Sequence, residues 1–555
     1  MRASFSKKYK GMLAAGVAAP AICFGGAMAQ PSLEISEYRI QSDDCGLNAC
    51  GMPEFTSEAD ASAFFAGDLA TRQARASGAG GAPGYLKWRR NYNPYGRGEK
   101  QTVFLDFDAG GLPTFPVCFT NGAVFGVFND YVYSQEERDA IQSRIAADYA
   151  KFDYKFTQTE PSVGEYSTLL IGLNDAPLDC SQGSNIQLTP TGGLSILFGR
   201  AENIDFRNQS KTDAAFADAS LWAFLAQFDA LAGTNNLGNL SGIPTTPETR
   251  AEVLSLAVLN QTSNTGAHEL GHIQGLRHHD SIGAPGDGLP ASGVPNPNSF
   301  IPVFTGPQDA DETPLHIMAS GASVGLTLTG STITDRFFAE RSAVKLSIAR
   351  NAERVLEEDF FEKSFWGKKR TRIMPLLPFY VPNTLVEGDN AGSRRLDADG
   401  LVIAGAIGEV GEVDEYMFFG KKGKFVNIEM VSFSDDRFVN PVIGAMKLSK
   451  VNWDGTRTEV ASNIQTFEPF DPLIFDQELP ESGVYVVEID APNIVYIDLN
   501  GDGVPDPFPL EETGNGSLRA GDYEIAIYSV DGKMGRPRGY DFYKQRRPYQ
   551  SAWKN

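Results

Sequence analysis

The chain has 555 residues, 42% hydrophobic and 21% charged, which is the composition of a folded protein too long for one compact core. Its 70 acidic residues outnumber its 48 basic residues, and the formal net charge is −22. This charge repels nucleic acid and anionic membranes, so neither is an expected partner. We expect two or more domains.

Residues 1–29 have the pattern of a secretory signal peptide. A basic start with Arg2 and three lysines is followed by a short apolar run and by Ala-Met-Ala, which signal peptidases accept. The apolar run is shorter than the roughly twenty residues of a membrane anchor. We therefore expect cleavage near Ala29 and export to the periplasm or the medium, with no membrane span.

Export places the remaining cysteines in an oxidising compartment. The default pairing joins Cys45 with Cys50 and Cys118 with Cys180, although three connectivities are possible. Residues 30–100 are rich in glycine and alanine and contain a basic KWRR sequence near their end. We interpret them as a pro-segment or N-terminal extension.

Helix and strand patterns then follow one another along the chain. Alternation predicts a strand at 101–108, and residues 134–152 predict an amphipathic helix that opens with a capping box of Ser134 and Glu137. Three strands are predicted in YKFTQTE, YSTLLIGL and GLSILFGR, and a second helix at 213–231. A third helix is expected to begin after Thr246-Pro247.

Four of the five histidines lie in GAHELGHIQGLRHHD, residues 266–280. On a helix, His268 and His272 lie on one face and can direct both imidazoles to one spot. Gly275 can adopt the left-handed conformation that ends a helix, so that His278 reaches the same spot. Zinc binds imidazole tetrahedrally, and three protein ligands leave one position for water, as in catalytic sites.

Glu269 follows the first of these histidines and is not expected to bind the metal. Its carboxylate can take a proton from a zinc-bound water, whose pKa the metal lowers towards about 7. The same proton can later go to the leaving amine. The expected reaction is therefore hydrolysis of peptide bonds, with Zn²⁺ as the cofactor and a protein or peptide as the substrate.

The extended HExxHxxGxxH spacing resembles the metzincin clan of zinc endopeptidases, over about residues 101–358. TPLHIMASGA resembles the methionine turn of that clan, which implies that Met318 supports the ligand histidines from below; an ordinary core methionine is the alternative. Ser320 stands where some members carry a tyrosine ligand, so none is expected. The resemblance also implies that GGLSILFGRAEN forms an edge strand along the substrate cleft.

Two histidines are not assigned by this pattern. His279 matches none of the residues common after the third ligand, and His316 precedes the methionine by two positions. Each can contact the ligand histidines, donate a hydrogen bond to the transition state, or merely lie nearby. A last helix near 342–358 is expected to close a catalytic domain of residues 101–360.

ACGMPEF, in the pro-segment, resembles the cysteine switch of matrixins, in which a thiolate occupies the open zinc position. The resemblance implies that Cys50 is a latency thiol. Glu54 replaces the usual aspartate, however, and no arginine precedes the cysteine. A disulfide between Cys50 and Cys45 is the alternative, which we favour.

The remaining chain has a different pattern of short strands and turns. We interpret 361–384 as a linker, 385–530 as an all-β sandwich accessory domain and 531–555 as a basic tail. The strand pattern of the second region resembles the prepeptidase C-terminal domain of secreted bacterial proteases. The expected fold is thus an α+β metzincin-like catalytic domain, with a twisted mixed sheet plus helices, followed by a β-sandwich.

The sequence DLNGDGVPD indicates a calcium loop inside this second domain. Its candidate ligands for Ca²⁺ are Asp498, Asn500, Asp502 and Asp506. Pro509 occupies the position where a complete calcium loop has a glutamate, and a plain polar hairpin is the alternative.

The sequence as a whole predicts a secreted zinc-dependent endopeptidase that is made as a precursor. The alternative from another class is a catalytically silent metzincin-like binding or adhesion protein, against which the presence of Glu269 argues. Hydrolysis of a non-peptide amide is also compatible with the motif.

Overall fold

The structure is a computed structural model that describes most of residues 101–530. The gaps within this range are 109–112, 173–179, 181–184, 190–192, 282–284, 287–315, 320–335, 358–360, 364–368, 372, 380, 382–397, 434–437, 439, 465–469, 498 and 500–505. Before residue 101 it describes 37–40, 57–59, 61–63 and 66. The signal peptide, the basic tail, Cys45 and Cys50 therefore lie outside the described residues.

The first sheet of the N-terminal half has the strand order β5-β2-β6-β10-β9. Four of its strands are parallel, and β9 runs antiparallel to β10 at the end of the order. The five strands are β2 (Gln101–Asp106), β5 (Tyr154–Thr157), β6 (Ser167–Ile171), β9 (Gly199–Ala201) and β10 (Ala214–Ala217).

A second sheet of the N-terminal half has the order β1-β8-β7-β3-β4. Its strands are β1 (Glu37–Ile40), β3 (Thr114–Phe119), β4 (Val124–Asn129), β7 (Ile186–Leu188) and β8 (Gly193–Ile196). β1 comes from the expected pro-segment and pairs in parallel with β8. The disulfide between Cys118 and Cys180 anchors β3, which confirms this part of the default pairing.

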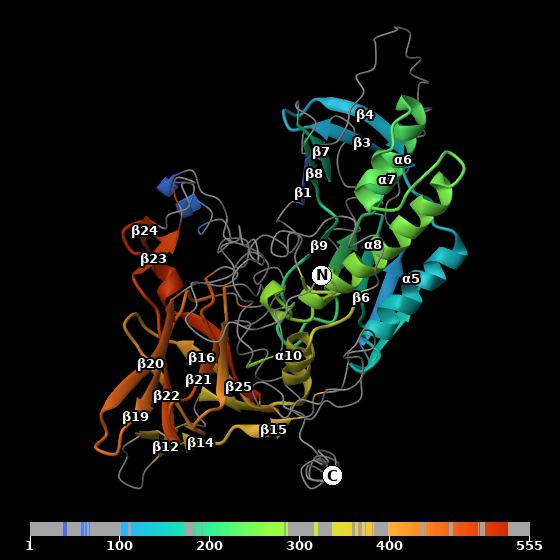
Figure 1. Cartoon of the computed structure of the whole chain (residues 1–555). Coiled ribbons are helices and arrows are strands. Elements are labelled where there is room, and N and C mark those ends of the chain that lie inside the picture. Colours follow the sequence, from blue (N-terminus) through green and yellow to red (C-terminus); the bar gives the residue numbers. More distant parts are fainter. Residues whose placement is uncertain are drawn as a thin grey trace.

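Helices cover the first sheet, and the long helix α8 is central among them (Figure 1). It packs against α5, α6, β9 and β10. The helices are α5 (Gln135–Asp148), α6 (Ser220–Ala232), α7 (Asn236–Ser241), α8 (Arg250–His272) and α10 (Glu340–Asn351), and η1 (His278–Ser281) is a single 3₁₀ turn.

The start of α5 confirms the predicted capping box. Glu137 N donates to Ser134 Oγ at 3.2 Å, and Ser134 N donates to Glu137 Oε2 at 2.8 Å, so two of the amide groups left free at the start of the helix are satisfied. Ile141 and Ile145, on the predicted apolar face, are fully buried. The pattern therefore predicted both the element and the face that it buries.

Two predicted helices are shorter than expected. The region 213–231 begins with strand β10, because Ala214–Ala217 pairs with β6, and α6 starts only at Ser220, whose N–H donates to Asp218 Oδ1 at 2.8 Å. α8 starts at Arg250 rather than directly after Thr246-Pro247, because Thr246 and Thr249 exchange hydrogen bonds in a preceding turn.

The predicted helix at 342–358 also ends early. α10 stops at Asn351, and Glu353–Leu356 forms strand β11, which pairs in parallel with β16 of the C-terminal part. The expected linker contributes β14 (Ile373–Met374) and β15 (Leu377–Phe379), which pair with β17 and β16, and the hairpin of β12 (Phe361–Lys363) and β13 (Lys369–Thr371). This segment thus belongs to the C-terminal sheets in space.

The C-terminal part consists of two main sheets that share one hydrophobic cluster, which we call the C-terminal sandwich. The first has the order β11-β16-β25-β18-β21, and β15 adds to β16; the second has the order β14-β17-β22-β19-β20. A small pair, β23 with β24, lies beside them. The strands not yet bounded are β16 (Ala398–Ile407), β17 (Asp414–Gly420), β18 (Phe425–Val431), β19 (Ala445–Val451), β20 (Arg457–Ile464), β21 (Leu473–Glu478), β22 (Gly483–Asp490), β23 (Ile494–Ile497), β24 (Asp506–Pro509) and β25 (Gly521–Val530).

The structure is therefore mixed, with helices and several sheets, and rich in strands. Among the described residues, none of the helices has both the length and the apolar character needed to cross a membrane.

Candidate metal centre

Three histidines meet at the C-terminal end of α8. His268 and His272 lie one turn apart on this helix, and His278 opens the turn η1 that follows it. Their Nε2 atoms are close: that of His268 lies 3.0 Å from that of His272 and 3.3 Å from that of His278. All three side chains are buried, with at most 6% of each residue exposed.

Backbone carbonyl groups set the orientation of two of these rings. Nδ1 of His268 lies 2.6 Å from the carbonyl oxygen of Ile317, and Nδ1 of His272 lies 2.9 Å from that of Leu276. A carbonyl oxygen only accepts, so each Nδ1 donates its proton and each Nε2 presents a lone pair. Fixing the tautomer in this way is typical of histidines that bind metals.

The arrangement fits a metal ion. Ligand nitrogens at 2.0–2.1 Å from a tetrahedral zinc ion are about 3.3 Å apart, which is close to the two separations observed. In the part of the chain that the structure describes, His268, His272 and His278 form the one group of histidine, cysteine or carboxylate side chains with suitable spacing. The donor set of three imidazoles is compatible with zinc.

The chain turns sharply between the second and third histidines. Gly275 has a φ of +90°, in the left-handed region, and its N–H donates to the carbonyl of His272 at 2.8 Å. A Cβ atom on Gly275 would lie 2.6 Å from Cα of Phe206. The glycine is thus required both by its conformation and by the close approach of the loop that carries Phe206.

Glu269 lies on α8 beside the edge strand β9. The residue is 1% exposed, and a Cβ atom on Gly199 of β9 would collide with its carboxylate and lie only 2.5 Å from Cγ2 of Thr265. GGLSILFGRAEN was predicted as one edge strand, but the structure divides it between two sheets: 193–196 pairs with β7, and only 199–201 forms the edge of the first sheet. β9 therefore positions the candidate base.

Met318 lies beneath α8, as the resemblance to the methionine turn implies. It is fully buried, and a Cβ atom on Gly271 would lie 2.5 Å from its Sδ atom. The neighbouring Ile317 supplies the carbonyl that orients His268. Ile317 and Met318 thus contact α8 at His268 and at Gly271, which precedes His272.

The two unassigned histidines have different surroundings. His316 Nδ1 lies 2.6 Å from the carbonyl of Ser281, at the end of η1, and burial lowers its pKa below the ordinary value. His279 lies 3.7 Å from Asp280 Oδ1 and against the ring of Phe475 in the C-terminal sandwich. Burial, followed by the nearby cation Lys345, lowers the pKa of His279 well below its ordinary value.

Several predicted site residues cannot be placed. Asp498, Asn500 and Asp502 lie outside the described residues, as do Cys50 and Ser320. Of the calcium candidates, Asp506 is described: it begins β24, and its Oδ2 accepts a hydrogen bond from the N–H of Leu499 at 3.3 Å. The calcium loop and the latency thiol stay predictions.

Sequence reasoning missed the residues that hold the histidines in place. The carbonyls of Leu276 and Ile317 leave no signal in a sequence, because any residue type supplies a carbonyl. Gly199 is a single glycine in a strand pattern, which can mark a close approach of another group. The buried charges around η1, described below, come from distant segments and have no local signature.

Comparisons with known proteins do not extend this description. No family model matches the chain, and no curated protein matches it. The solved structures that resemble part of it include the pre-peptidase C-terminal domain of collagenase from Bacillus anthracis, the periplasmic lysozyme inhibitor PliG from Aeromonas hydrophila, and a protein from Sulfurospirillum deleyianum. They are 12%, 10% and 10% identical, cover 23%, 24% and 24% of this chain and 86%, 85% and 97% of their own chains, and each has a TM-score of 0.14. At these values they carry no conclusion about family or activity.

Proposed function

We propose that the protein is an exported zinc-dependent endopeptidase of the metzincin type. The observation that supports this best is the convergence of the Nε2 atoms of His268, His272 and His278 at the end of the helix that also carries the buried Glu269. The placement of Met318 under the same helix adds support. The disulfide between Cys118 and Cys180 is in keeping with an oxidising compartment.

The residues of the site have different roles in the proposed reaction. The three histidines would hold Zn²⁺, which supplies a Lewis acid with one open coordination position. Glu269 accepts a proton from the water that attacks the peptide carbonyl carbon. When the C–N bond breaks, Glu269 returns this proton to the leaving amine nitrogen, so that the carboxylate is regenerated. Gly199 of β9 leaves the space that the carboxylate occupies.

The remaining features of the precursor belong to the same proposal. Residues 1–29 direct export, residues 30–100 form a pro-segment, and the C-terminal sandwich is an accessory domain of the prepeptidase C-terminal type. The strand pattern and the signal-peptide pattern of the sequence support these assignments.

The test compares wild type with Glu269→Gln, which keeps the shape of the side chain but removes its basicity. Zinc content is measured by elemental analysis, and hydrolysis is measured on a denatured protein such as casein. We expect about one zinc ion per chain in both proteins and a loss of hydrolysis of about 10²-fold or more in the variant. Glu252→Gln, on the exposed first turn of the same helix, is the matched control.

Two outcomes would contradict the proposal. Bound zinc without hydrolysis in the processed wild type would favour the binding or adhesion protein that the sequence leaves as an alternative. Equal hydrolysis by wild type and Glu269→Gln would remove the role of this glutamate as the base.

A further inference from the structure

The turn that carries the third histidine is surrounded by buried charges from both halves of the molecule. Arg277 directly precedes the turn, Asp280 lies within it, and Lys345 lies on α10. Glu429 and Asp471 belong to the C-terminal sandwich. None of these five side chains is more than 1% exposed.

Asp280 fixes the turn itself. Its Oδ2 accepts a hydrogen bond from the N–H of Arg277 at 2.8 Å, and its backbone carbonyl accepts one from the Ser342 hydroxyl at 2.8 Å. Lys345 Nζ lies 3.8 Å from the same carboxylate oxygen. One turn of backbone, with His278 inside it, is therefore attached to α10.

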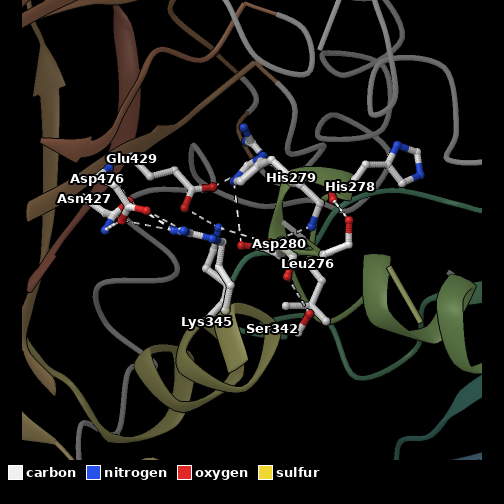
Figure 2. Close-up of polar contacts among 12 residues, drawn as sticks. Leu276, His278, His279, Asp280, Ser342, Lys345, Asn427, Glu429 and Asp476 are labelled. Atoms are coloured by element: carbon white, nitrogen blue, oxygen red, sulfur yellow. Dashed lines mark hydrogen bonds and ion pairs between the residues drawn. The ribbon is translucent and has the colours of Figure 1, made fainter. Parts of the chain in front are cut away.

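Glu429, on β18 of the sandwich, contacts two of the cations near the turn. Glu429 forms an ion pair with Lys345, and its Oε1 lies 3.6 Å from Nε of Arg277. Asp471 adds a second contact, with Oδ2 at 3.0 Å from Nη2 of Arg277. Figure 2 shows Asp280, Lys345 and Glu429 in consecutive contact, with His278 to the right of Asp280.

Backbone groups of the sandwich hold Asp471. Asp471 accepts hydrogen bonds from the N–H groups of Ser432 and Phe433 at 3.0 and 2.8 Å. The position of Asp471 is thus set by the chain that directly follows β18.

A second contact joins α10 to the sandwich. Arg341 Nη2 lies 2.6 Å from Asp476 Oδ2, and its guanidinium group stacks over the ring of Phe475, 3.9 Å from the centroid. Asp476 also accepts a hydrogen bond from Asn427 at 2.8 Å. α10 is therefore held against β18 and β21 at more than one point.

Apolar residues also join the N-terminal half to the C-terminal sandwich. The larger hydrophobic cluster contains Leu276 and Val344 of the N-terminal half together with Val402 and Tyr528 of the sandwich. The buried charges thus lie within a continuous core and are not exposed to solvent.

A buried ion pair often adds little net stability, whereas removing one of its partners is strongly destabilising. Charges without water are strongly unfavourable unless every partner is in place, and the loss of one partner leaves an uncompensated charge. Glu429 and Asp471 supply the carboxylates that contact Lys345 and Arg277 in this buried group. It follows that the sandwich constrains where the turn of His278 lies.

We propose that the C-terminal sandwich is part of the metal centre: Glu429 and Asp471, acting through Arg277 and Lys345, hold the His278 turn where its imidazole meets those of His268 and His272. Glu429 and Asp471 are positioning residues. The inference rests on the metal-binding part of the proposed function and not on peptide hydrolysis.

The experiment uses the full chain and the variants Glu429→Gln and Asp471→Asn. Zinc affinity is measured by competition with a chelator of known affinity, and folding of the zinc-free proteins is checked by circular dichroism and thermal melting. Asp414→Asn is the matched control, because Asp414 is a buried carboxylate that accepts a hydrogen bond from Tyr523 inside the sandwich.

We expect both variants to fold and to bind zinc about 10-fold or more weakly than wild type, the loss typical when groups that orient metal ligands are removed. The visible absorption of the Co²⁺-substituted proteins reports ligand geometry directly. It should change in Glu429→Gln and Asp471→Asn and stay as in wild type in Asp414→Asn.

Folded variants with the zinc affinity and the Co²⁺ spectrum of wild type would overturn the proposal. A lower melting temperature with unchanged affinity would overturn it as well, because it would mean a purely structural role. The titrations need no substrate, so a wild type that binds zinc without hydrolysing peptides would contradict the proposed function alone.

Discussion

At the scale of single residues, the candidate site is held by groups that do not themselves meet at its centre. The carbonyls of Ile317 and Leu276 turn the Nε2 atoms of His268 and His272 towards each other. Gly275 allows the chain to reverse its direction within three residues, which brings His278 to the same point. The convergence of the three rings thus depends on local backbone geometry.

Gly199 tests how closely β9 positions the candidate base. Alanine at this position would collide with the Glu269 carboxylate, which must then move. Since a displacement of about 1 Å can lower activity by about 10²-fold, we expect Gly199→Ala to reduce kcat by that order while zinc content is unchanged.

The control for this prediction is Gly516→Ala, because an added Cβ there meets its nearest neighbour, Cγ of Glu511, at an ordinary 3.5 Å. Full activity in Gly199→Ala would show that the glutamate can shift without consequence.

Asp130 is expected to make stability depend on pH. Burial, followed by the nearby charge of Asp218, raises its pKa from 3.8 to about 7. The folded state therefore holds this proton more tightly than the unfolded state does, so the contribution to stability is complete below about pH 4 and is lost as the pH rises through about 7. Asp130→Asn should raise the melting temperature at pH 8 and have less effect at pH 5. An equal effect at both pH values would contradict this assignment.

The metal ligands could be predicted from the sequence, but the groups that hold them in position could not. The spacing of His268, His272 and His278 is sufficient to predict one metal site, because two ligands share a helix face and the third follows a glycine at which the helix can end. The β9 strand and the charges of the sandwich come from elsewhere in the chain, and nothing near the motif indicates them.

At the scale of elements, α5 could be predicted because its signals are local. Ser134 and Glu137 satisfy each other within one turn, and the buried isoleucines follow the helical period. β10 and β11 were wrongly predicted as parts of helices. Their short segments become strands because they pair with β6 and β16, and this tertiary pairing outweighs local propensity.

The capping box of α5 gives a prediction at this scale. Ser134→Ala removes the side chain that accepts from the N–H of Glu137. We expect a loss of about 1 kcal/mol in the free energy of unfolding, measured with urea, and no change in zinc affinity. Replacement of the exposed Ser162 by alanine is the control. A variant as stable as wild type would mean that water replaces the cap without cost.

At the scale of the whole molecule, the sequence predicted a mixed N-terminal domain and a β-sandwich. In the structure, the larger hydrophobic cluster contains residues of both. Leu276, which directly precedes the charged turn, lies in the same hydrophobic cluster as Tyr528 of the last strand. Such a contact could not be read from the sequence, because more than two hundred residues separate the two positions.

This shared core predicts how the molecule unfolds. Zinc at 100 times its dissociation constant should stabilise the folded state by about 2.7 kcal/mol. We expect calorimetry to show one transition that shifts upwards as a whole when zinc is added and downwards when a chelator removes it. Two transitions, of which zinc moves only one, would show that the sandwich unfolds independently.

The central claim is that three imidazoles hold one metal ion with an open position. X-ray absorption at the zinc edge of the purified, processed protein tests it most directly. The account predicts three nitrogen ligands from imidazole and one further oxygen ligand, all at about 2.0–2.1 Å. A sulfur ligand, a fourth imidazole or the absence of bound zinc in this form would contradict it.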